Sequence, residues 1–255
     1  MPRIALGLEY DGTEFCGWQR QPTGRSVQAC VEDALSRVAD HPVTAQCAGR
    51  TDAGVHASAQ VVHFDSPSVR TLRGWQLGTN GHLPPDVSVV WARFVPDDFH
   101  ARYWARSRTY VYRIINQAAR SALHRHRACW VPRPLDAAAM SAAAQHLVGT
   151  HDFESFRAAE CQARTSTRTL HRLQVVRADA WITIEACADA FLHHMVRNLA
   201  GVLIRVGLGD APPEWVFDVL AARDRRCAGV TAPAAGLCLV GVAYDAHLEL
   251  PSGAA

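Results

Sequence analysis

Residues 48–57, Ala-Gly-Arg-Thr-Asp-Ala-Gly-Val-His-Ala, concentrate side chains that can do chemistry. Arg50, Asp52 and His56 lie between glycines in a segment expected to be a loop between two strands. Such loops carry function disproportionately. Two interpretations of Asp52 stay open. A lone aspartate in a glycine-rich loop can simply form a turn. Alternatively, Asp52 is a nucleophile whose ionised form is favoured by neighbouring Arg50.

Other motifs with possible chemistry are less specific. The pair His193-His194 suggests a metal site, but adjacent helical positions point in different directions and no HExxH pattern is present. We therefore expect a half-buried or solvated pair. His124 and His126 lie among arginines and are expected to join a basic face.

The composition excludes several mechanisms. The 255 residues are 49% hydrophobic and 20% charged, as in ordinary globular proteins. The chain has no lysine, so Schiff-base lysines and P-loops ending in Gly-Lys are ruled out. Its eight cysteines are scattered without a Cys-x-x-Cys pair, which predicts free thiols. With no signal-peptide pattern and no long apolar run, we expect a soluble, cytoplasmic protein.

Charge is segregated along the chain although the net charge is only +2. Residues 91–133 hold nine arginines and two acids, and residues 157–177 hold five arginines and one acid. Guanidinium groups match phosphate oxygens, so these stretches suit nucleic-acid binding. A solvated basic patch is the alternative that charge alone leaves open.

Hydrophobic periodicity predicts an α+β protein with two ferredoxin/RRM-like halves. We expect the antiparallel sheets of the two halves to meet at a central basic cleft. The predicted domains are 1–105 and 106–248, followed by a flexible tail at 249–255. Glycines in 74–81 weaken the helix expected there. The expected strands are 4–10, 43–49, 58–65, 87–95, 109–115, 169–177, 180–187 and 237–244, and the expected helices are 27–39, 136–148, 190–206 and one starting at Pro212-Pro213.

Seven segments in order resemble motifs of the TruA family of tRNA pseudouridine synthases, and the resemblance runs from about residue 4 to about residue 245. One of them, residues 49–56, resembles the family's active-site motif. The others are residues 10–19, 99–102, 108–114, 151–157, 161–164 and 191–198.

The resemblance implies an enzyme that isomerises uridine to pseudouridine at positions 38, 39 and 40 of the tRNA anticodon arm, without cofactor or metal. It implies a homodimer with no membrane partner. By the motif match, Asp52 is the catalytic aspartate and Tyr110 is an active-site tyrosine that stacks on the uracil and serves proton transfer. Arg197 matches an arginine that keeps Asp52 ionised and oriented.

The same resemblance implies that the arginines of the basic segments bind tRNA. Arg102, Arg106 and Arg108 border the strand of Tyr110 and are expected to contact tRNA phosphates. The predicted substrate-binding residues are Tyr110, Arg50, Arg70, Arg102 and Arg164. Two alternative functions remain open. One is a noncatalytic RNA-binding protein with RRM-like halves, and the other is a hydrolase that would release free uracil.

Overall fold

The computed structural model describes residues 1–161 and 163–251, and it divides into two compact units. Unit 1 holds Met1–Arg108 together with the chain from Cys238 onward, and unit 2 holds Thr109–Leu237. Each unit combines helices with parallel and antiparallel strand pairs, so the α+β class is confirmed. No helix in the described part of the chain is long and apolar enough to span a membrane.

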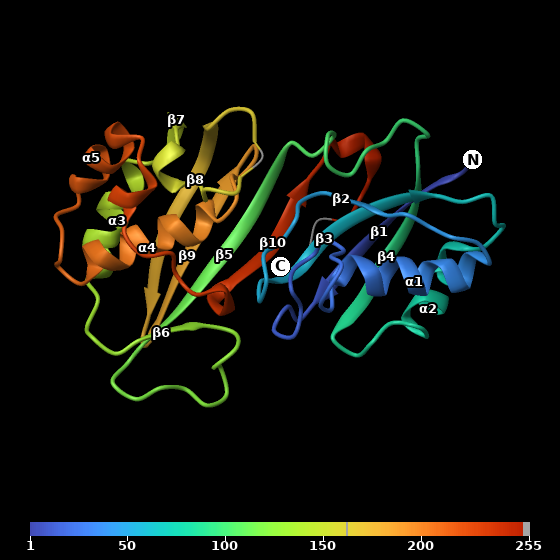
Figure 1. Cartoon of the computed structure of the whole chain (residues 1–255), viewed down its shortest axis with the longest axis horizontal. Helices are drawn as coiled ribbons and strands as arrows, with labels where there is room; N and C mark the ends of the chain where they lie inside the picture. Colours follow the sequence, from blue (N-terminus) through green and yellow to red (C-terminus); the bar gives the residue numbers. More distant parts are fainter. Residues whose placement is uncertain (162, 252–255) are drawn as a thin grey trace. The chain divides into compact units, whose positions relative to one another are not determined.

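Unit 1 is a sheet with two helices on one face (Figure 1). The strand order is β4-β1-β3-β10, and β2 pairs with β3. β1 runs antiparallel to β3 and β4, whereas β10 runs parallel to β3 with Cys238 opposite His56. The elements are β1 (Arg3–Tyr10), α1 (Val27–Ala39), β2 (Gln46–Cys47), β3 (His56–Asp65), α2 (Leu72–Asn80), β4 (Val87–Val95) and β10 (Leu237–Ala243).

Unit 2 has the strand order β5-β9-β8-β7, with β6 parallel to β5. Helices α3 and α4 pack on each other, and α3 packs on β8 (Figure 1). The elements are β5 (Ser107–Asn116), β6 (Cys129–Val131), α3 (Ala137–Gln145), β7 (Gly149–Asp152), β8 (Thr167–Ala178), β9 (Trp181–Ala188), α4 (Met195–Gly207) and α5 (Trp215–Ala222).

Local sequence signals explain several of these boundaries. Ser26 caps α1 by accepting the backbone N–H of Ala29, as its predicted N-cap role requires. Asp136 caps α3 by accepting two backbone N–H groups. The helix over Leu72–Asn80 forms despite its glycines, because Thr71 caps it and Trp75 is completely buried against Phe64.

Three expectations differ from the structure. The strand predicted at 43–49 is reduced to the two residues of β2. The helix predicted at 190–206 begins only at Met195, because His194 has a left-handed backbone (φ 61°) that ends any helix before it. The division into units also differs from the predicted domains, since β10 joins unit 1 by pairing with β3. All eight cysteines are free thiols, as predicted.

Candidate active site

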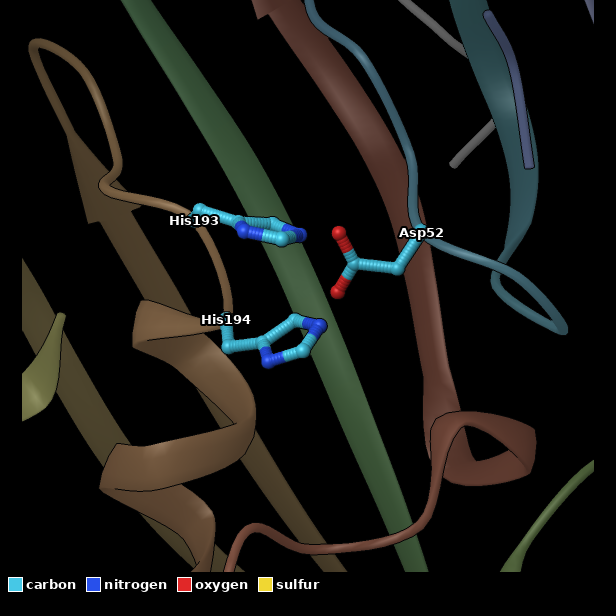
Figure 2. A group of neighbouring side chains, drawn as sticks. All are labelled: Asp52, His193 and His194. Carbon is cyan, nitrogen blue, oxygen red and sulfur yellow. The ribbon is translucent and has the colours of Figure 1, made fainter. Parts of the chain in front are cut away.

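Asp52 lies on the loop between β2 and β3, half-buried in unit 1 (Figure 2). The loop backbone is held by the segment that follows β1. The N–H of Trp18 donates to the Thr51 carbonyl at 3.0 Å, and the N–H of Gly54 donates to the Phe15 carbonyl at 3.2 Å. The two backbone hydrogen bonds flank Asp52, so they fix the backbone from which its carboxylate extends.

Two glycines make this close approach possible. A Cβ on Gly17 would lie 2.7 Å from the Thr51 carbonyl oxygen, and a Cβ on Gly12 would lie 2.0 Å from the Val55 carbonyl oxygen. Gly17 also has a φ of +100°, which side chains with a Cβ rarely adopt. Residues 10–19, recognised in the sequence only as a motif, therefore act in the structure as a clamp on the Asp52 loop.

Buried polar groups hold the loop from the sheet side. The hydroxyls of Tyr10 and Thr51 lie 2.8 Å apart, and the Gln60 amide donates to the Gly49 carbonyl at 2.7 Å. Gln60 is completely buried and Tyr10 nearly so. Hydrogen bonds in such a setting are expensive to break, because each orphaned group costs about 1–3 kcal/mol.

His56 holds the C-terminal end of the Asp52 loop. Its Nδ1 accepts the backbone N–H of Gly12 at 3.0 Å, which assigns the ring proton of the neutral form to Nε2. The same nitrogen lies 3.1 Å from Asp11 Oδ1. Protonation of Nδ1 would therefore exchange the Gly12 bond for an ion pair with Asp11.

Arg108 departs from its predicted role. It is only 9% exposed, and its guanidinium donates to the carbonyls of Ala48, Arg102 and Ala105. The prediction of a phosphate contact is wrong for this residue, because its donors are spent inside the protein. Arg108 ties the start of the Asp52 loop to the turn at 102–105. Arg106 forms a salt bridge with Asp245 at 2.7 Å.

The remaining predicted arginines of unit 1 are on its surface. Arg50 is exposed in the Asp52 loop, and Arg102 is exposed on the turn before β5. Arg70 is exposed in the connection to α2, where its guanidinium donates to the carbonyls of Val38 and Val69. Arg102 is thus linked to the Asp52 loop through Arg108, whereas Arg70 lies in a different part of unit 1.

Cys47 immediately precedes the loop and could in principle compete with Asp52 as a nucleophile. Burial raises the pKa of its thiol to about 12, although Arg50 and Arg102 act in the opposite direction. The thiol therefore stays protonated at neutral pH, and a protonated thiol is a poor nucleophile.

In unit 2, Tyr110 is a buried residue of β5, 8% exposed. Its ring meets that of Phe191 edge to face, with centroids 5.2 Å apart. This is an established geometry for aromatic pairs. It places the Tyr110 strand next to the segment that leads into α4.

The turn into α4 carries His193 and His194, whose ring centroids lie 4.1 Å apart (Figure 2). The expectation that they point in different directions is wrong, because the left-handed backbone of His194 takes the pair out of helical geometry. Both are half-buried, as expected. Within either unit taken alone, the described residues hold no group of three His, Cys, Asp or Glu side chains close enough to share a metal ion.

Arg197 lies half-buried in the first turn of α4. Its Nε donates to the Ala232 carbonyl at 2.9 Å, and its own carbonyl accepts the Ala232 N–H at 3.1 Å. The adjacent residues are fixed as well. Thr231 Oγ1 donates to the buried Asn198 amide oxygen at 2.7 Å, and Arg225 donates to both side chains. This network fixes the backbone on both sides of the Arg197 contact.

The basic segment around Arg164 is held by another arginine. Arg157 donates to the carbonyls of Cys161 and Ala163 at 2.7 and 3.1 Å. Arg164 itself is exposed. Gln162, part of the motif noted in the sequence, lies outside the described residues.

Sequence reasoning missed the residues that position the site, namely Gly12, Gly17, Arg108, Arg157 and Arg225. Gly12, Gly17, Arg108 and Arg157 all lie inside motifs noted in the sequence, and that was the available signal, although no motif showed that these residues position the site. The three arginines are indistinguishable in sequence from surface arginines, since only burial separates a guanidinium spent on carbonyls from one free to bind phosphate.

Comparison with known proteins identifies the family. A sequence profile described as tRNA pseudouridine synthase matches residues 8–104 and 143–245. The chain is 54% identical over 252 residues to the tRNA pseudouridine synthase A of Alcanivorax borkumensis, covering 98% of this chain and 94% of that protein. It is 53% identical to that of Pseudomonas aeruginosa (98% and 88% covered) and 52% identical to that of Xanthomonas euvesicatoria (98% and 98%).

Both matched regions include a described part of the site. The first contains the Asp52 loop with its glycine clamp, and the second contains the start of α4 with Arg197. On this profile match and these full-length identities, the chain belongs to the tRNA pseudouridine synthase family.

Proposed function

We propose that this protein isomerises uridine to pseudouridine at positions 38, 39 and 40 of the tRNA anticodon arm, with Asp52 as the nucleophile. The observation that carries the proposal is the clamped loop. Asp52 is the one carboxylate in a segment fixed by backbone bonds on both sides and by two glycines that admit no side chain. Holding a reactive group in one geometry is a large part of what an enzyme contributes.

The reaction conserves all non-hydrogen atoms of the base. The bond between uracil N1 and ribose C1′ breaks, the base turns, and a bond forms between C5 and C1′. The hydrogen on C5 leaves as a proton, and N1 ends with a proton. Asp52 acts by covalent attack on C1′ of the ribose or C6 of the base. No oxidation or reduction takes place, so the chemistry requires no redox cofactor.

Two residues of unit 2 complete the proposed chemistry. Tyr110 stacks on the uracil, and its hydroxyl serves proton transfer. Its edge contact with Phe191 supports this role, because it holds the ring in one orientation. Arg197 keeps the Asp52 carboxylate ionised and oriented. The paired bonds of Arg197 with Ala232 support a fixed placement of its guanidinium.

The exposed arginines Arg50, Arg70, Arg102 and Arg164 are proposed to contact tRNA phosphates. Such contacts position an RNA and do not read its sequence. The target uridine must leave its stack, which costs a few kcal/mol that contacts in the site offset. Recognition of three adjacent positions then rests on RNA shape and flexibility.

The proposal includes an architecture. Unit 1 carries the Asp52 loop and unit 2 carries the Tyr110 strand and the Arg197 helix, as two RRM-like halves whose sheets meet at a basic cleft. The enzyme acts as a cytoplasmic homodimer. Exposure of the four arginines supports a basic RNA-facing surface.

The test is tritium release from unmodified tRNA labelled at uracil C5. We expect release by the native protein and none by Asp52→Asn, which keeps the size of the side chain and removes its charge. Asp40→Asn is the matched control. Asp40 is an exposed residue with a left-handed backbone (φ 60°), which asparagine also tolerates. This variant should release tritium at the native rate.

Other outcomes select other functions. Release by Asp52→Asn at the native rate would keep the isomerisation and remove Asp52 as its nucleophile. Free uracil in the reaction would indicate the hydrolase. Binding of tRNA without any tritium release would indicate the noncatalytic RNA-binding protein.

A further inference from the structure

Three rings of unit 1 contact one another in a tilted stack that runs from the core to the surface, with 60° between the planes of His63 and His100. His63 on β3 is 4% exposed, and its ring centroid lies 4.6 Å from that of His100. The His100 ring in turn lies 4.2 Å from that of Tyr103, with 37° between the planes. Tyr103 ends the stack and is 75% exposed. A large aromatic side chain is thus presented to solvent at the end of an ordered column.

The turn that carries this stack is firmly held. His63 Nδ1 accepts the backbone N–H of Ala101 at 3.1 Å, and His100 Nδ1 accepts that of Arg102 at 3.1 Å. The Tyr244 hydroxyl donates to the Ala101 carbonyl at 2.6 Å. Tyr103 is therefore exposed on a rigid turn, where its ring adds little to the core of unit 1.

Charge around Tyr103 favours an anionic partner. The Arg102 guanidinium carbon lies 5.9 Å from the Tyr103 ring centroid, and both side chains are exposed. Two acids, Asp97 and Asp98, belong to the same connection, and both act on nearby Arg3. An exposed aromatic ring beside an exposed arginine is the combination that binds single-stranded nucleic acid, because every base has a face that can stack.

The position of this turn relative to the Asp52 loop is set by one residue. Arg108 donates to the Arg102 carbonyl at 2.5 Å and to the Ala48 carbonyl at 2.9 Å. The turn and the start of the loop are therefore held by the same guanidinium. An RNA held at Tyr103 would have a fixed distance to Asp52.

We propose that Tyr103 and Arg102 form a stacking platform for an unpaired base of the RNA substrate, with Arg102 at the neighbouring phosphate. That the RNA is a tRNA rests on the proposed function. The platform would bind a base other than the target uracil, which is proposed to stack on Tyr110. It also gives the exposed ring at the end of the stack a role.

The experiment measures the dissociation constant of unmodified tRNA for the full-length protein. Tyr103→Leu should weaken binding about 5- to 150-fold, the range for loss of one base–aromatic stack. Tyr103→Phe keeps the ring and should stay within about 2-fold of the native protein. Phe94→Leu is the matched control, because Phe94 is another exposed aromatic of unit 1, on β4, and is 55% exposed. It should bind tRNA like the native protein.

Salt dependence separates the two members of the platform. Arg102→Gln should lower the slope of log affinity against log salt by about 0.7–0.9, the amount expected for one phosphate contact. Tyr103→Leu should leave that slope unchanged, since stacking releases no counterion. A Tyr103→Leu variant that changes the slope would overturn the proposed division of roles.

Native affinity in Tyr103→Leu would overturn the platform. A change of oligomeric state in this variant, measured by sedimentation, would overturn it too, because the ring would then contact a second copy of the chain. Tritium release separates this inference from the proposed function. Release by the native protein with normal binding by Tyr103→Leu refutes the platform alone. Weakened binding by Tyr103→Leu without tritium release by the native protein supports the platform and refutes the isomerisation.

Discussion

His63 makes the stability of this protein depend on pH between about 6.5 and 4. Burial is the main cause that lowers its pKa from 6.5 to about 4, and the neighbouring charges of His100 and Arg3 act in the same direction. The ring is therefore neutral in the folded protein at neutral pH. Its unprotonated Nδ1 accepts the Ala101 N–H, which a protonated nitrogen could not do.

The sign and the size follow from linkage. Below about pH 6.5 His63 is protonated in the unfolded chain, whereas in the folded protein it stays neutral until about pH 4. The free energy of unfolding therefore falls as the pH falls through this window. The pKa difference is worth about 3 kcal/mol in total, of which about 2 kcal/mol is lost between about pH 7.5 and pH 5. This is a large fraction of a typical unfolding free energy.

Urea unfolding at these two pH values, on the native protein and on His63→Asn, measures the effect. Asparagine offers an acceptor near the position of Nδ1 and cannot be protonated, so the variant should lose about 2 kcal/mol less than the native protein on acidification. His82→Asn, at an exposed histidine, is the control and should lose as much as the native protein. Equal losses in the native protein and in His63→Asn would refute the assignment of this pH dependence to His63.

Two further predictions concern the parts that hold the site. Gly17→Ala should lower kcat by about 10²-fold, because its Cβ would push the Thr51 carbonyl next to Asp52. Gly24→Ala is the control, because Gly24 has a comparable positive φ (+91°) but does not contact Thr51. Both variants should lose about 1–3 kcal/mol of stability in thermal unfolding, whereas only Gly17→Ala should lower kcat. Equal kcat values in the two variants would contradict the clamp. Thr231→Val should destabilise the protein by about 1–3 kcal/mol in urea, because it removes two hydrogen bonds of the network, the one from Thr231 to the buried Asn198 oxygen and the one from Arg225 to Thr231. Thr231→Ser keeps the hydroxyl and should lose less than Thr231→Val, whereas equal losses would show that the hydroxyl contributes nothing.

Local signals in the sequence were enough for elements whose boundaries depend on neighbouring residues. The helix over Val27–Ala39 follows from its N-cap and apolar spacing, and the strand over Val87–Val95 from its apolar composition. The start of α4 could not be predicted in the same way. The apolar stripe continues back to Phe191, but a left-handed residue at His194 interrupts the helix, and no sequence rule places a left-handed histidine there.

The candidate site also has parts that local sequence signals identify and parts that depend on tertiary contacts. Asp52 could be identified because its motif is contiguous and its composition is unusual. The parts that hold it come from distant segments, and their roles depend on tertiary contacts. Arg108 shows the limit most clearly. Its sequence neighbourhood is as basic as that of Arg102, yet one guanidinium is buried on carbonyls and the other is exposed.

The most direct measurement of the central claim is to map pseudouridine in tRNA after incubation with the protein. Unmodified tRNA is first incubated with the protein and then treated with a carbodiimide that leaves a stable adduct on pseudouridine. Primer extension on the treated tRNA shows where synthesis stops. We expect stops that report positions 38, 39 or 40 after incubation with the native protein and none after incubation with Asp52→Asn. Stops only at other positions, or none with the native protein, would contradict it.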